Sequence, residues 1–268
     1  MAAIDTIACY QGTVNSTLAA GTFATGDSGT VRNFPQQASC YLAQTFYDDV
    51  TTPLAWRVRS PLLHDNVQGI RFNSTVSAPS RQFPGALNQQ LQPQDQLTVE
   101  LSTAASTGKA LGVLELYYTQ LPGAAARLYG PGDIIGNIDN IKPIYIAVGS
   151  GANTAGQWYD LVITTSEDLT HANTDYAVLG ATFDQAVACI AVKGVDTGNL
   201  RVGIPGGTND PFGPDFLWRL SEEMGMPCIP VINSANKGST YVSIVSSAAT
   251  GAAGTITLYL AELHQNLA

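Results

Sequence analysis

Two stretches of this chain have nearly the same sequence, and they constrain the fold more than any other feature. Residues 112–121 read GVLELYYTQL, and residues 254–263 read GTITLYLAEL. Both begin with glycine, both are rich in apolar and β-prone residues, and both place Leu-Tyr at the same position, at an offset of 142 residues. A strand pattern repeated at this distance predicts two similar β-rich units in one chain.

The match extends upstream of both stretches. Residues 97–108 read LTVELSTAASTG, and residues 241–251 read YVSIVSSAATG. Together with the strand that follows, each copy reads as strand, small-residue turn and strand. The pattern therefore predicts a β-hairpin in each half of the chain.

A third pair of segments shows where the two copies differ in length. Residues 54–72 resemble residues 187–202, and the alignment places Arg71 opposite Arg201 at an offset of 130. The offset between the two copies grows from 130 at these arginines to 142 at the last strands, which indicates an insertion of about a dozen residues in the second copy. Residues 213–225 fit this insertion as a helix, because a proline stands in the first turn and a glycine follows the last.

The strand candidates form two series of eight. They are 4–12, 20–32, 38–48, 53–60, 67–73, 86–92, 95–102 and 110–120, followed by 143–149, 157–165, 174–182, 185–193, 198–204, 228–233, 239–246 and 254–263. Short strands with regular turn signals predict a sandwich or barrel in each half. Crossover helices between the strands are missing, which excludes a parallel α/β fold. We expect a first domain over 1–121, a linker over 122–141 and a second domain over 142–268.

Composition indicates which partners the surface favours. Charged residues are 12% of the chain, about half the share of roughly 25% in an average domain. Low charge is typical of surfaces covered by neighbouring subunits, although a merely low-charge β protein would look the same. The net charge is −9, with −1 on residues 1–130 and −8 on residues 131–268. The chain has no basic run, which disfavours direct nucleic-acid binding.

Cysteine use and hydropathy predict a soluble protein made inside the cell. The N-terminus lacks the basic and apolar regions of a signal peptide, and no apolar run approaches the roughly 20 residues of a membrane span. The cysteines are widely spaced, show no C-x-x-C pairing and fit small buried side chains better than a disulfide framework. They are Cys9, Cys40, Cys189 and Cys228.

The duplication, the two series of eight strands and the helix inserted before the last three strands make the sequence similar to one family. It resembles the double jelly-roll major capsid proteins of tailless icosahedral viruses and phages. The resemblance implies an all-β fold of two tandem eight-stranded jelly-roll barrels, with a short helix in the second. It also implies self-assembly into pseudo-hexameric homotrimers that contact neighbouring capsomers and a vertex (penton) protein. The resemblance further implies, as a possible partner, an internal membrane beneath the shell, and it implies that the subunits are made in the host cytoplasm.

A search for reactive side chains predicts no catalytic, cofactor-binding or metal-binding residues. Each of the three histidines lacks a second histidine or a cysteine at metal-ligand spacing. Adjacent acids on a strand or helix point in different directions, so the acidic pairs favour a solvated surface over a general acid–base pair. The residues weighed are His64, His171, His264, Asp48, Asp49, Glu167, Asp168, Glu222 and Glu223.

Two further sets of residues leave alternatives open. Asp133 and Asp139, near Asn137 and Asn140, could hold a structural calcium ion, but the spacing is not that of a calcium loop and favours a turn cluster. The tryptophans are expected in different settings. Trp56 and Trp158 fit the core better than a sugar platform, whereas Trp218 on the predicted helix favours a subunit contact.

The leading hypothesis is therefore a structural virion protein without enzymatic activity. One alternative is a two-barrel glycan-acting hydrolase, which would need converging acids in a cleft between the barrels. The other is a phage receptor-binding or tail-associated β protein, which would show fibrous repeats or aromatic binding loops.

Overall fold

The structure is a computed structural model, and it describes most of the chain. The described residues are 2–13, 16–35, 38–47, 54–63, 66–74, 81–82, 89–103, 108–118, 121–149, 153–163, 169, 171–185, 187–206, 213–247 and 254–267. The fold is mostly β, with antiparallel pairing in every sheet.

Strands of the first half form two sheets. The strands are β1 (Ala3–Gln11), β2 (Ala19–Ala20), β3 (Thr22–Phe23), β4 (Cys40–Tyr47), β5 (Leu54–Arg59), β6 (Ile70–Ser74), β7 (Arg81–Gln82), β8 (Gln89–Leu91), β9 (Thr98–Thr103) and β10 (Lys109–Tyr117). One sheet has the order β3-β1-β10-β4-β7, with β8 also paired to β4. The other has the order β2-β9-β5-β6.

Strands of the second half form two further sheets. The strands are β11 (Leu128–Tyr129), β12 (Ile138–Val148), β13 (Tyr159–Val162), β14 (Asp175–Phe183), β15 (Cys189–Lys193), β16 (Val202–Pro205), β17 (Ile229–Asn233), β18 (Tyr241–Val245) and β19 (Gly254–Leu263). The orders are β11-β17-β14-β19-β12 and β13-β18-β15-β16. All sixteen strand segments expected from the sequence contain a strand, so the all-β prediction is confirmed.

The two halves share one strand order. Within each half, the first, eighth, third and sixth strands of the series form one sheet: β1-β10-β4-β8 and β12-β19-β14-β17. The second, seventh, fourth and fifth strands form the other: β2-β9-β5-β6 and β13-β18-β15-β16. The duplicated sequence pattern therefore corresponds to a duplicated strand topology.

The predicted hairpins in the repeated stretches are wrong. β9 pairs with β2 and β5, whereas β10 pairs with β1 and β4, so these consecutive strands lie in different sheets. The same holds for β18 and β19. Both strands of each pair are apolar because each contributes to a sandwich core, and this pattern is the same whether two strands pair or face each other.

The segment expected as a linker contains regular structure. It holds β11, the short helix α1 (Pro131–Ile134) and the 3-10 helix η1 (Ile135–Asn137), and β12 begins at Ile138, earlier than the sequence indicated. Ile134 is fully buried against the outer side of the β11-β17-β14-β19-β12 sheet, in a small apolar cluster with Val231 and Leu263. Burial of these side chains holds the segment on the sheet.

The inserted helix lies where the sequence places it. The 3-10 helix η3 (Gly213–Asp215) leads into α2 (Phe216–Met224), and Gly225 ends α2 with a φ of 61°. Phe216, Leu217 and Leu220 are fully buried. Phe216 packs edge-on against Phe46 of the first half at 5.6 Å, so the insertion helps to join the halves.

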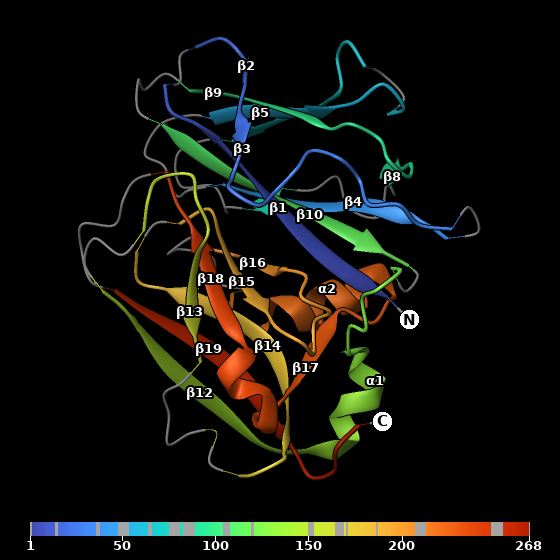
Figure 1. Cartoon of the computed structure of the whole chain (residues 1–268), viewed down its shortest axis with the longest axis vertical. Coiled ribbons are helices and arrows are strands. Elements are labelled where there is room, and N and C mark those ends of the chain that lie inside the picture. The colour runs from blue at the N-terminus through green and yellow to red at the C-terminus, as the bar shows by residue number, and fades with distance from the viewer. Residues whose placement is uncertain are drawn as a thin grey trace.

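The four sheets are stacked as layers (Figure 1). From top to bottom, the view shows β9 with β5, then β1, β10 and β4, then β15 and β16, and then β14, β19 and β12. One continuous cluster of buried apolar residues extends through both halves. No helix in the described part of the chain has the length and apolar character that a membrane span requires.

Candidate functional site

The acids and histidines weighed from the sequence do not converge on one site. Glu222 and Glu223 are exposed on α2, as expected for solvated carboxylates. His264 is exposed as expected, with Nδ1 at 3.5 Å from Asp139 Oδ1, and His171 contacts Glu262. His64, Asp48, Asp49, Glu167 and Asp168 lie outside the described residues. Among the described residues, no three His, Cys, Asp or Glu side chains gather closely enough to hold a metal ion.

The polar residues near the start of the second half serve as local structure. Asp133 accepts a hydrogen bond from the backbone N–H of Gly130 at 3.0 Å. Asn137 donates to the carbonyl of Gln265 at 2.7 Å and accepts from its N–H at 3.0 Å. These contacts fasten the C-terminal segment to η1.

The tryptophans lie in different environments. Trp56 is fully buried and stacks on Phe72, which confirms the core prediction. Trp158 is partly buried and packs against the main core. Trp218 packs on the small cluster under α1 and donates to Glu222 at 2.8 Å, and its role as a subunit contact stays a prediction.

The four cysteines are free and buried, as expected. Burial raises the pKa of the Cys9 thiol and of the Cys228 thiol to about 12. It raises the pKa of Cys40 and Cys189 as well. These side chains therefore act as small apolar groups.

We expect the native protein to resist thiol reagents. At pH 8, a colorimetric disulfide reagent should label none of the four cysteines within minutes, because the thiolate is both scarce and inaccessible. The same assay in denaturant should label all four. Rapid labelling of the native protein would contradict the burial of these thiols.

A charged cluster joins the two halves. Asp27 of the first half accepts hydrogen bonds from Trp158 Nε1 at 2.5 Å and from Arg201 Nη1 at 3.3 Å. The Arg201 guanidinium lies 4.7 Å from the centre of the Trp158 ring, a cation–π contact. Desolvation raises the pKa of Asp27, although its hydrogen bonds and Arg201 oppose this. The cluster fixes the two halves in one orientation.

The sheets on either side of the junction approach very closely. The N–H of Gly203 on β16 donates to Thr6 Oγ1 on β1 at 3.0 Å. A Cβ atom at Gly203 would lie 2.3 Å from that oxygen, closer than real contacts allow. Gly156, with a φ of 69°, approaches the Tyr10 ring just as closely. The junction is therefore packed like a protein interior.

One outer face of the stack carries arginines. It belongs to the sheet β2-β9-β5-β6, where Arg57 lies opposite Arg71 on one side and Glu100 on the other. Glu100 forms ion pairs with Arg57 and with Arg59, the latter at 3.2 Å. Desolvation acts to raise the pKa of Glu100, but the hydrogen bonds and charges of both arginines lower it. Arg71 is exposed. This face is positively charged in a chain whose net charge is −9.

The other outer face is apolar and hydroxyl-rich. It belongs to β12 and β19, where Tyr145 lies opposite Thr257 and Pro143 opposite Tyr259. Tyr145 is 61% exposed and Ile141 is 47% exposed. From Ile141 onward, the outward residues of these two strands are uncharged, and the exposed Asp139 lies at the bulge near the start of β12. The uncharged outward residues are Ile141, Pro143, Tyr145, Ala147, Thr255, Thr257 and Tyr259.

The repeat relates these outer faces to the internal junction. Inside the chain, the sheet of β1, β10 and β4 meets the sheet of β15 and β16. By strand order, the exposed face of β12 and β19 corresponds to the first surface, and that of β5 and β6 corresponds to the second, whereas α1 and η3 cover β14. Arg71, the counterpart of Arg201, lies on the exposed face of β5 and β6. Each of the two outer faces thus corresponds to one of the two surfaces that meet where the halves of the chain join.

A buried acid pair, missed in the sequence, lies in the first half. Glu115 on β10 is directly opposite Asp5 on β1, and these residues are 1% and 7% exposed. Tyr117 donates its hydroxyl hydrogen to Glu115 Oε2 at 2.6 Å, and Arg32 pairs with Asp5 at 2.7 Å. Desolvation is the main cause that raises the pKa of Glu115, to about 8. A single charged residue inside an apolar strand was the available signal.

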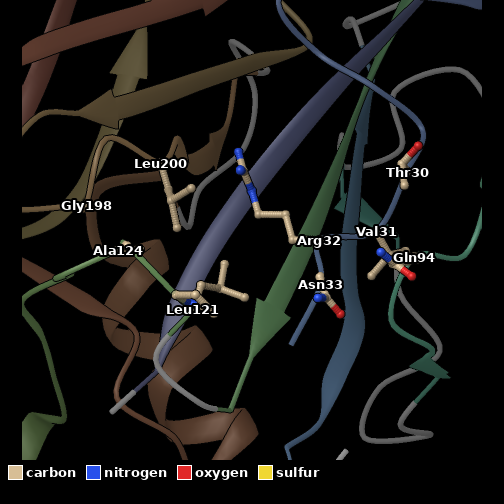
Figure 2. A pocket seen from close by; sticks show the side chains of 11 residues that line it. Thr30, Val31, Arg32, Asn33, Gln94, Leu121, Ala124, Gly198 and Leu200 are labelled. Carbon is tan, nitrogen blue, oxygen red and sulfur yellow. The ribbon is translucent and has the colours of Figure 1, made fainter. Parts of the chain in front are cut away.

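A groove of about 480 Å³ between the two halves is lined by Arg32, the partner of Asp5. Figure 2 shows the Arg32 side chain extending toward the side where Leu200 lies, with Leu121 and Ala124 of the connecting segment below. The Arg32 side chain is 52% exposed. Solvent therefore reaches the cation next to the buried acids.

Comparisons with known proteins find distant structures. No protein-family model matches the chain, and no curated protein sequence matches it. A crystal structure of the PBSX exported protein XepA has 9% identity and a TM-score of 0.24, covering 97% of this chain and 86% of that chain. A cryo-EM structure of the T=1 Penaeus vannamei nodavirus has 9% identity and a TM-score of 0.22, covering 97% of both chains. At these TM-scores neither structure defines the fold or the function of this chain.

Proposed function

We propose that the chain is the major capsid subunit of a tailless icosahedral virus or phage, and that each half is a jelly roll. The observation that carries the proposal is the shared strand order of the two halves together with their head-to-tail stacking. In a head-to-tail contact, the two halves meet through two different surfaces. The equivalent surface at each outer end of the chain is therefore still exposed. Repeated head-to-tail contacts form a closed ring when the rotation from one unit to the next divides a full turn evenly.

The proposed assembly is a homotrimer with six similar units around its axis. In it, the arginine-bearing face of β5 and β6 meets the apolar face of β12 and β19 on the next copy. Arg71, which corresponds to Arg201 at the internal junction, then lies against exposed aromatic side chains such as Tyr145 of the next copy. Three such seams produce the pseudo-hexagonal outline that tiles a shell.

The same proposal gives the chain a structural role and no catalytic one. Two buried acids near the junction are paired with arginines, Asp27 with Arg201 and Asp5 with Arg32. The further proposed partners are neighbouring capsomers, a vertex protein and an internal membrane, without direct nucleic-acid contact. The proposed location is the virion.

Light scattering coupled to size-exclusion chromatography tests the proposal. We expect a species of three times the 28.2 kDa chain mass, and larger particles under assembly conditions. A monomer under every condition of salt, pH and concentration would overturn it. Hydrolysis of a glycan by the purified protein, lost on substitution of one acid, would favour an enzyme instead.

A further inference from the structure

The acid pair of Glu115 and Asp5 places two carboxyl groups side by side in a buried strand ladder. Opposite residues of an antiparallel pair have Cβ atoms about 5 Å apart, and two like charges at that distance repel. β1 and β10 are central strands of their sheet, and the opposite faces of both pack on β16. Any force that separates them acts directly on the junction between the halves.

No arginine, lysine or histidine forms an ion pair with Glu115 in the described part of the chain, although the nearby Arg32 charge lowers its pKa in part. Arg32 donates its Nε–H to Asp5 and its backbone N–H to the Tyr117 hydroxyl, so its guanidinium is committed to Asp5. Tyr117 and Cys40 are neutral neighbours, because burial raises the pKa of both side chains. Asp27 adds a further negative charge near Glu115. Glu115 Oε1 has no hydrogen-bond partner among the described residues.

We propose that Glu115 and Asp5 form an alkali-sensitive lock. Glu115 is protonated in the folded subunit at neutral pH, and its ionisation in alkaline solution weakens the pairing of β1 with β10 and the junction of the two halves. This device belongs to the single chain and holds whether or not the protein forms a capsid.

The direction of the pH dependence follows from proton linkage. Glu115 has a higher pKa in the folded state, about 8, than the ordinary value of 4.5 in the unfolded chain. The folded state therefore holds the extra proton between these values, so its stability falls as the pH rises from 4.5 to about 8 and levels off above that. Between pH 6 and pH 9.5 this group should increase the unfolding equilibrium constant by about a hundredfold.

Urea unfolding of the full chain at pH 6 and pH 9.5 tests the lock. The wild type should lose stability across this interval, whereas Glu115→Gln should lose about a hundredfold less in the equilibrium constant. Glu222→Gln, which changes an exposed glutamate on α2, should behave as the wild type. Equal losses in the wild type and in Glu115→Gln would overturn the proposal.

A second measurement needs no variant. Carbon-13 NMR of glutamate carboxyl groups in the wild-type chain should show one carboxyl that titrates above pH 7. Glutamate carboxyls that all titrate below pH 6 would overturn the proposal, even if Glu115→Gln fails to fold. Because both measurements use the isolated chain, their failure would leave the capsid proposal untouched.

Discussion

Replacing Arg71 by glutamate is expected to abolish the trimer while leaving the subunit folded. Arg71 is exposed on the outer face of β6, so its substitution should leave the core intact. In the proposed seam, however, glutamate would replace a cation that lies against an aromatic ring. Truncating a desolvated charged group at an interface costs about 2–5 kcal/mol, which is a factor of roughly 30 or more at each seam.

The measurement is the mass of the particle by light scattering at matched protein concentrations. Lys237→Glu is the control, because it makes the same charge change at an exposed position in the 3-10 helix η4 (Ser234–Ser239), outside both outer faces. The expected result is a monomer for Arg71→Glu and a trimer for Lys237→Glu. A stable trimer with Arg71→Glu would remove this face from the seam.

The second large effect is expected inside the chain, at Gly203. Its substitution by alanine forces a methyl group to within 2.3 Å of Thr6 Oγ1 and 2.9 Å of Thr6 Cβ, so one of the two sheets must move. Overpacking of this kind costs about 1–3 kcal/mol. Loss of the hydrogen bond from Gly203 to Thr6 adds about 1 kcal/mol. We therefore expect the free energy of unfolding to fall by about 2–4 kcal/mol.

Chemical denaturation followed by circular dichroism measures this effect. Gly238→Ala makes the same change at a glycine whose added Cβ would contact nothing within 4 Å, and it should change the stability by less than about 0.5 kcal/mol. If Gly203→Ala is as stable as Gly238→Ala, the close approach of β1 and β16 is not a feature of the molecule in solution.

The sequence predicts the strands well because their signal is local. Short runs of apolar and β-prone residues bounded by turn residues mark the strands, and the insertion of α2 is visible from its proline and glycine. The pairing of strands is not local, which is why the pattern of GVLELYYTQL wrongly predicts a hairpin with the strand before it. In the structure, β9 and β10 face each other across the core of the first half.

The features that govern the junction were not predictable from residue patterns. Asp27, Trp158 and Arg201 meet only because the two halves stack, and they come from three segments far apart in the chain. Glu115 could have been flagged as a charge within an apolar strand, but its opposite position to Asp5 depends on the register of β1 and β10. Gly203 gives no signal until its contact with Thr6 is known.

A cryo-EM map of the assembled protein tests the central claim most directly, because that claim concerns both the repeated unit and the way the units meet. Three chains should appear around one axis, forming six two-sheet units in which the face of β5 and β6 contacts the face of β12 and β19 on the next chain. Halves that fail to superpose, or chains that associate through other surfaces, would contradict it.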